Sequence, residues 1–258
     1  MTGLLVRLNK PQSFTRNPWR DRAGICLTEL LIALAAGAIV LAATLDTLRH
    51  FETRLWAQLG HVAHHQEFRL GVQILAGELR LAGTGSPPES SALILAEERS
   101  VEFLANLDGV VTALTEPVAE FARDLPVRDG SGWPQGKRIL VCTRSHCAEG
   151  RLARGGRSHW LSLVHPLGAA FPAGSPVVVS NRVRYYLGNS QDGKPSVMRR
   201  VDGGTNALME GIGQFRLTYY DREGRLTTEP SRVARVRIHA AGPNERTSLV
   251  QEVTLRAT

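Results

Sequence analysis

The sequence predicts an α+β protein in which one long N-terminal helix packs on an antiparallel β-sheet domain. Two patterns lead to this prediction. Apolar residues spaced three and four apart run through the first third of the chain, and short segments rich in β-branched and aromatic residues fill the remainder. Of the 258 residues, 43% are hydrophobic and 21% are charged, which is typical of a folded protein with a sizeable core.

The first 24 residues are basic. Residues 1–24 hold five arginine or lysine residues and one aspartate, a net charge of +4 out of +7 for the whole chain. Because this excess lies beside an apolar run, it predicts a membrane orientation with the N-terminus in the cytoplasm. It therefore argues against nucleic acid as the partner of this charge.

An apolar run follows at residues 25–45, and Glu29 is its only charged residue. A helix of 21 residues spans about 30 Å of hydrocarbon and is longer than the apolar region of a cleaved secretory signal, so we expect a transmembrane helix. A lone carboxylate inside lipid is costly and normally has a partner. A cut after Gly24 would provide one, because the new ammonium group of Ile25 would lie four residues before Glu29 on nearly the same helix face.

Residues 46–83 keep the helical period but become polar on one side, which predicts an amphipathic helix that continues the apolar one. Gly83, followed by two prolines, predicts its end. The glycines inside it are expected to weaken it and to let it bend. The predicted apolar stripe consists of Leu48, Phe51, Leu55, Leu59, Val62, Phe68, Val72, Leu75, Leu79 and Ala82.

Residues 84–258 predict a β-rich globular domain. In 234–239, apolar residues alternate with Arg235, Arg237 and His239, as in a sheet with one buried face, and 221–224 (DREG) predicts a turn. Segment 114–121 fits no single pattern. The predicted strands are 138–142, 175–187, 214–221, 231–240 and 249–257.

The basic leader, Gly24 and the segment Ile25-Cys26-Leu27-Thr28-Glu29-Leu30 together resemble the prepilin N-terminal motif of type IV pilins and type II secretion pseudopilins. In that family a membrane peptidase cuts after the glycine on the cytoplasmic side and methylates the new N-terminus. A glutamate at the fifth mature position guides subunits into the filament. The resemblance thus implies cleavage between Gly24 and Ile25, N-methylation of Ile25 and an assembly role for Glu29. The chain departs from the family in Ile25, which is usually phenylalanine, and in its longer leader.

Four further segments resemble PilW-like and J-type minor pseudopilins: 68–83, 183–187, 198–204 and 208–224. This resemblance implies a minor subunit, of the kind that forms a tip complex and primes filament assembly. The implied partners are other minor and major pilins or pseudopilins, the prepilin peptidase, the inner membrane and the assembly platform. The implied location is the inner membrane, with a periplasmic C-terminal domain. A single-pass membrane-anchored periplasmic binding or scaffold protein is the alternative.

The chain holds three cysteines. Cys142 and Cys147 would form a disulfide outside the cytoplasm or would remain two free thiols, and Cys26 in the apolar run would be unpaired. His146 lies between the first two. We do not expect zinc there, because a fourth ligand is missing.

Other polar clusters favour solvated surfaces. His61, His64 and His65 have helical spacing that suits a metal ion, but only Glu67 is close enough to complete a site, so we expect no metal site.

Two arginine-rich stretches, 151–157 and 197–200, have charges that suit phosphates. No aromatic residues are interleaved with them, so we expect solvated loops and no nucleic acid. The sequence has no phosphate-binding glycine loop, H-E-x-x-H or G-x-S-x-G motif, so we expect neither an enzyme nor a cofactor.

Overall fold

The computed structural model describes residues 26–87, 90–243 and 248–256, with the backbone alone at 57–65. It confirms the α+β class: within these residues one long helix, α1 (Leu27–Arg80), precedes 14 strands whose pairing is antiparallel throughout. The chain divides after Gly60 into two units, and α1 runs from the first into the second.

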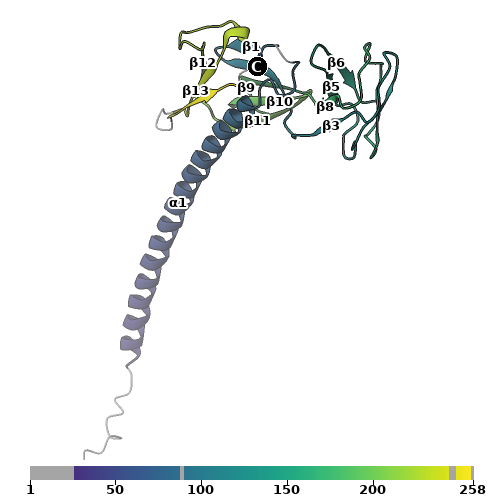
Figure 1. The fold of residues 1–258 in the computed structure, drawn as a ribbon. Helices are drawn as coiled ribbons and strands as arrows, with labels where there is room; N and C mark the ends of the chain where they lie inside the picture. The colour runs from purple at the N-terminus through teal and green to yellow at the C-terminus, as the bar shows by residue number, and fades with distance from the viewer. Residues whose placement is uncertain (1–25, 88–89, 244–247, 257–258) are drawn as a thin grey trace, which may run out of the picture. The chain divides into compact units, whose positions relative to one another are not determined.

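All the described strands belong to the second unit and form four sheets, ordered β1-β2-β9-β10-β11, β12-β13-β14, β3-β8-β5-β6 and β4-β7. Figure 1 shows the β3-β8-β5-β6 sheet on one side of this unit and β12 and β13 on the other. The elements are β1 (Leu93–Glu97), β2 (Ser100–Ala105), β3 (Val111–Ala113), β4 (Asp124–Pro126), β5 (Arg138–Cys142), β6 (Cys147–Arg151), β7 (Trp160–Ser162), β8 (Pro176–Val179), β9 (Asn181–Asn189), β10 (Pro195–Val201), β11 (Gly204–Glu210), β12 (Gln214–Tyr220), the 3-10 helix η1 (Pro230–Arg232), β13 (Arg235–Ala241) and β14 (Ser248–Thr254).

The end of α1 supplies one wall of the larger core. The stripe predicted over its last part is confirmed: Phe68, Val72, Leu75, Leu79 and Ala82 are buried and share a cluster with residues of β1, β2 and β9–β14. Burying such a stripe against a sheet is the main source of stability for a helix of this kind.

The start of the stripe, from Leu48 to Leu55, is exposed in this single chain, so its packing stays a prediction. Leu48, Phe51 and Leu55 are 51%, 65% and 41% exposed. The described part of the first unit holds no strand, so none of its described residues covers these side chains.

The helix ends at Arg80, three residues before the predicted boundary at Gly83. The N–H groups of Leu81 and Ala82 bond three residues back, to Glu78 and Leu79, which tightens the last turn. Gly83 then adopts a φ of +89° and donates its N–H to the carbonyl of Leu104 at 2.8 Å. Its lack of a side chain permits this left-handed conformation, which directs the chain into the sheet.

Two glycines of α1 have different environments. A Cβ at Gly71 would lie 2.2 Å from Cγ of Met209 on β11, whereas nothing lies within 4 Å of a Cβ at Gly77. Gly71 therefore permits the close approach of helix and sheet, and Gly77 has no such packing role.

Several predicted strands are confirmed, namely β5, β12, β13 and β14. The predicted strand 175–187 is instead two strands, β8 and β9, which belong to different sheets and are separated at Ser180. A continuous run of β-branched and polar residues gave no sign of this break. Segment 114–121 forms no strand and makes only isolated bridges at Leu114 and Val118.

The alternation predicted for β13 is confirmed, because Val236 and Ile238 are fully buried while Arg237 is exposed. On the paired strand β12, Tyr219 is also buried, and its hydroxyl donates to the carbonyl oxygens of Glu97 and Ser100 at 2.8 and 3.0 Å. Burial, together with the negative charge of Glu97, raises the pKa of Tyr219 well above its usual value.

A second, smaller core lies among β3–β8. The chain passes between the two cores directly, because β8 runs into β9 through Ser180, whose N–H bonds the carbonyl of Arg138 at 3.0 Å. This connection fixes the start of β9 beside β5.

Candidate functional site

The first candidate surface is the apolar part of α1, residues Leu27–Trp56, which is long and apolar enough to cross a membrane and has no buried residue. A membrane anchor and a signal sequence both have this character. Apart from Thr44, whose hydroxyl donates to the carbonyl of Val40, its side chains over 30–45 are apolar on all sides, as in a helix surrounded by lipid or by other helices.

Glu29 lies in the first turn of α1 and is exposed. Its N–H donates to the carbonyl of Cys26 at 2.9 Å, and within the described residues its carboxylate forms no ion pair. The positive end of the helix dipole lies at this turn and favours a negative charge there. Gly24 and Ile25, the predicted cleavage and methylation residues, lie outside the described residues.

The other end of α1 is joined to the sheet by a polar cluster of Glu78, Tyr185 on β9 and Arg199 on β10. Glu78 accepts the Tyr185 hydroxyl at 2.5 Å, Nη2 of Arg199 at 2.5 Å and Nε of Arg199 at 3.1 Å. The hydrogen bond to Glu78 raises the pKa of Arg199. Burial, followed by the charge of Glu78, raises the pKa of Tyr185, which stays a neutral donor.

Cys142 and Cys147 form a disulfide that closes the β5–β6 hairpin. A disulfide is typical of a domain outside the cytoplasm. His146 within the closed loop packs on Phe171, with ring centroids 4.9 Å apart, and its Nδ1 lies 3.1 Å from the Thr143 hydroxyl. Both contacts give this imidazole a structural role.

In the part of the chain that the structure describes, no group of three or more His, Cys, Asp or Glu side chains is placed to hold a metal ion. The side chains of His61, His64 and His65 lie outside the described atoms. Glu67 is exposed on α1.

The second candidate site is a pocket of about 670 Å³, which the sequence did not reveal. It brings together both arginine-rich stretches, through Arg151 of β6 and Arg200 of β10. The expectation of solvated loops was wrong for these two residues, because each lies in a paired strand. The positively charged residues that line the pocket are Lys137, Arg138, Arg151, Arg182, Arg184 and Arg200.

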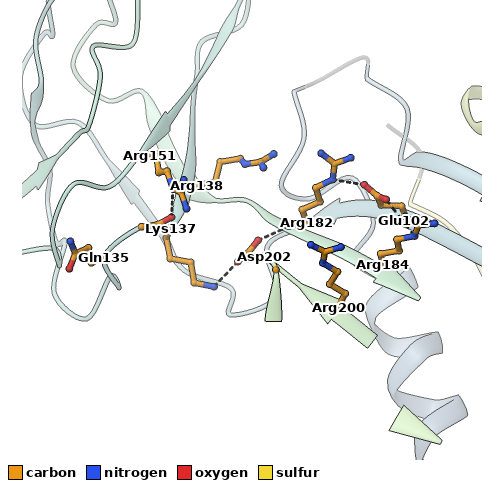
Figure 2. Close-up of a pocket in the computed structure, with 11 residues that line it drawn as sticks. Glu102, Gln135, Lys137, Arg138, Arg151, Arg182, Arg184, Arg200 and Asp202 are labelled. Carbon is orange, nitrogen blue, oxygen red and sulfur yellow. Dashed lines mark hydrogen bonds and ion pairs between the residues drawn. The ribbon is translucent and has the colours of Figure 1, made fainter. Parts of the chain in front are cut away.

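Two carboxylates, Glu102 and Asp202, also line the pocket (Figure 2). Asp202 bonds Nζ of Lys137 and Nδ2 of Asn181, each at 2.9 Å, and accepts the N–H of Arg182 at 2.9 Å. Partial burial opposes ionisation of Asp202, but these bonds outweigh it and hold the pKa of its carboxyl below the usual value.

The pocket also has a pattern that the sequence could have revealed in part. Arg182 and Arg184 alternate with the buried residues Val183 and Tyr185, which places both arginines on the same face of β9, opposite the core.

Comparison with protein-family models, with curated proteins and with solved structures gave no match to this chain.

Proposed function

We propose that the protein is a minor pilin or pseudopilin, which is cleaved between Gly24 and Ile25, N-methylated at Ile25 and incorporated at the tip of a type IV pilus or type II secretion pseudopilus. There it primes filament assembly together with other minor and major subunits. Its activity is assembly rather than catalysis. The observation that carries the proposal is Glu29, an exposed carboxylate without an ion-pair partner in the described residues, at the start of an exposed apolar helix.

The energetics of Glu29 favour a specific partner. A carboxylate at the centre of a membrane helix costs about 2.5–3.5 kcal/mol on insertion scales, which is an upper bound for Glu29 in the first turn of α1. A favourable helix dipole offsets about 0.3–1 kcal/mol of this. A nearby cation would offset the remainder, and 30–45 contains none. After cleavage, the ammonium group of Ile25 lies four residues before Glu29. It can therefore form an ion pair with Glu29 of the same subunit or of a neighbouring one.

The two parts of α1 suit the same role. The apolar part, Leu27–Trp56, is exposed and can exchange lipid for the helices of other subunits, while one face of the last part, from Phe68, is buried on the sheet. The Cys142–Cys147 disulfide supports a periplasmic location for the sheet domain. The size of this domain, residues 84–258, suits a minor subunit, since major pilins of the family are usually shorter.

The substitution Glu29→Ala tests the proposal. The variant should insert in the membrane at the wild-type level or better, because it loses a costly charge, yet it should disappear from the sheared filament fraction. Asp46→Ala is the matched control, because Asp46 is the next acidic residue of the same helix and is also exposed. It should assemble as the wild type does.

The alternative, a membrane-anchored scaffold protein, predicts another result. An anchor has no use for the charge of Glu29, so Glu29→Ala would leave both its membrane level and its partners unchanged. Wild-type levels of the Glu29→Ala variant in the filament fraction would contradict the proposed role.

A further inference from the structure

We propose that the pocket lined by the six basic residues is a binding site for a ligand that carries two or more adjacent phosphate groups. This site is independent of the proposed assembly function, because all of its residues lie between 102 and 203, far along the chain from Glu29.

The first observation is a repeated like-charge pairing. Arg184 of β9 lies directly opposite Arg200 of β10, and Arg138 of β5 lies directly opposite Arg151 of β6. Like charges directly opposite each other destabilise an antiparallel pair. Two such pairs, in two different sheets, line the same pocket. An anion bound between the two pairs would relieve the electrostatic repulsion within each of them.

The second observation is the surplus of positive charge. Six basic residues and two carboxylates line the pocket, a net charge of +4. Glu102 is shared, since it pairs with Arg182 and lies 3.9 Å from Nε of Arg184. Asp202 is occupied by Lys137.

The third observation is that donors remain free. Within the described residues, neither Arg151 nor Arg200 pairs with a carboxylate, and Arg151 uses only its Nε, on the carbonyl of Gly136 at 2.9 Å. Arg138 has only Glu149, at 3.9 Å. These guanidinium groups keep N–H donors for a ligand.

The arrangement of the donors favours phosphate over carboxylate. In Figure 2 Arg138 and Arg151 come from one side of the pocket and Arg182, Arg184 and Arg200 from the other. A tetrahedral phosphate offers oxygen atoms in several directions, whereas a carboxylate offers two in one plane. One phosphate group carries a charge of about −1.5 to −2 at neutral pH, so a pocket with a surplus of four calls for at least two.

The lining also argues against nucleic acid. No aromatic side chain is among the residues that line the pocket, so unstacked bases would find no platform there. A compact oligophosphate needs no such platform, and it can be free in solution or part of a lipid headgroup.

Calorimetric titration of the full-length chain in non-ionic detergent with inorganic tripolyphosphate tests the proposal. We expect saturable binding that weakens as the salt concentration rises, because salt screens the attraction between solvent-exposed charges. The double variant Arg151→Gln/Arg200→Gln should bind about tenfold more weakly or not at all, since it loses the two arginines without ion pairs. Arg222→Gln is the matched control, because Arg222 is exposed in a turn outside the pocket. Its affinity should equal that of the wild type.

The urea midpoint of the double variant distinguishes a binding role of these arginines from a purely structural one. Without ligand, the double variant should unfold at about the same urea concentration as the wild type, because relief of two like-charge pairs offsets loss of the hydrogen bond from Arg151 to Gly136. A lower midpoint would mean that these arginines hold the fold together, and it would overturn the proposal.

Further probes identify the source and the class of the ligand. Binding to vesicles that carry a bisphosphorylated lipid, lost in the double variant, assigns a headgroup, while tripolyphosphate binding alone assigns a free oligophosphate. Tighter binding of citrate or hexaglutamate than of tripolyphosphate would overturn the phosphate class. So would binding of duplex DNA without binding of tripolyphosphate, or equal weakening in Arg222→Gln.

Discussion

The substitution Arg199→Met removes the cation that joins β10 to Glu78 at the end of α1. Arg199 makes three contacts with the Glu78 carboxylate, at 2.5, 3.1 and 3.1 Å, and the two side chains are only 23% and 15% exposed. Breaking a fully buried pair costs about 3–5 kcal/mol, because the remaining charge stays buried without its partner. Partial exposure lowers this, so we expect a loss of about 2–4 kcal/mol in the free energy of unfolding.

Urea denaturation of the full-length chain in non-ionic detergent, followed by circular dichroism and tryptophan fluorescence, measures this loss. In thermal unfolding, a loss of about 3 kcal/mol in the free energy of unfolding lowers the melting temperature of a unit of this size by about 6–12 °C. The control Arg216→Met breaks an exposed pair with Glu98, in which the side chains are 57% and 60% exposed. It should cost at most about 1 kcal/mol.

A double-mutant cycle separates the ion pair from simple loss of packing. Glu78→Met combined with Arg199→Met should be less destabilising than the sum of the single changes, since no unpaired charge remains. A cost below about 0.5 kcal/mol for Arg199→Met, or strictly additive effects, would refute the reasoning that this pair joins helix to sheet.

Three further predictions concern the same domain. Gly71→Ala should destabilise the chain by about 1–3 kcal/mol through overpacking against β11, whereas Gly77→Ala should stabilise it by up to about 1 kcal/mol through helix propensity, as urea midpoints will show. Because the folded-state pKa of Tyr219 is raised above its unfolded value of about 10, this tyrosine should not change stability below that pH. Above it, stability should fall by up to about 1.4 kcal/mol per pH unit, and less steeply in Tyr219→Phe. Thiol labelling of the urea-unfolded chain should find one reactive cysteine before reduction and three after it, and three before reduction would contradict the Cys142–Cys147 bond.

The elements that the sequence predicts correctly are those that local pattern determines. The stripe from Phe68 to Ala82 and the alternation of β12 and β13 each record one buried face, and a period of three to four or of two reveals such a face without knowledge of its partner. The same pattern cannot tell whether a partner exists. The stripe residues before Trp56 have the same spacing, yet they are exposed in this chain.

The elements that the sequence did not predict depend on how strands pair, which local pattern does not reveal. Strands β10 and β11 hold few β-branched residues, and their place in the sheet follows from pairing, of β10 with β9 and of β11 with β10. The chain breaks at Ser180 because β8 and β9 belong to different sheets, and the sequence alone does not reveal these sheets. The basic pocket likewise needs the register of four strands, because Arg151 and Arg200 are brought together only by the fold.

At the N-terminus, the proposed cleavage after Gly24 would create the ammonium group of Ile25 that pairs with Glu29. Mass spectrometry of the N-terminal peptide, taken from protein in the filament fraction of cells that hold the prepilin peptidase, tests this most directly. We expect a peptide that begins with N-methylated Ile25. A filament subunit that still begins with Met1 would contradict it.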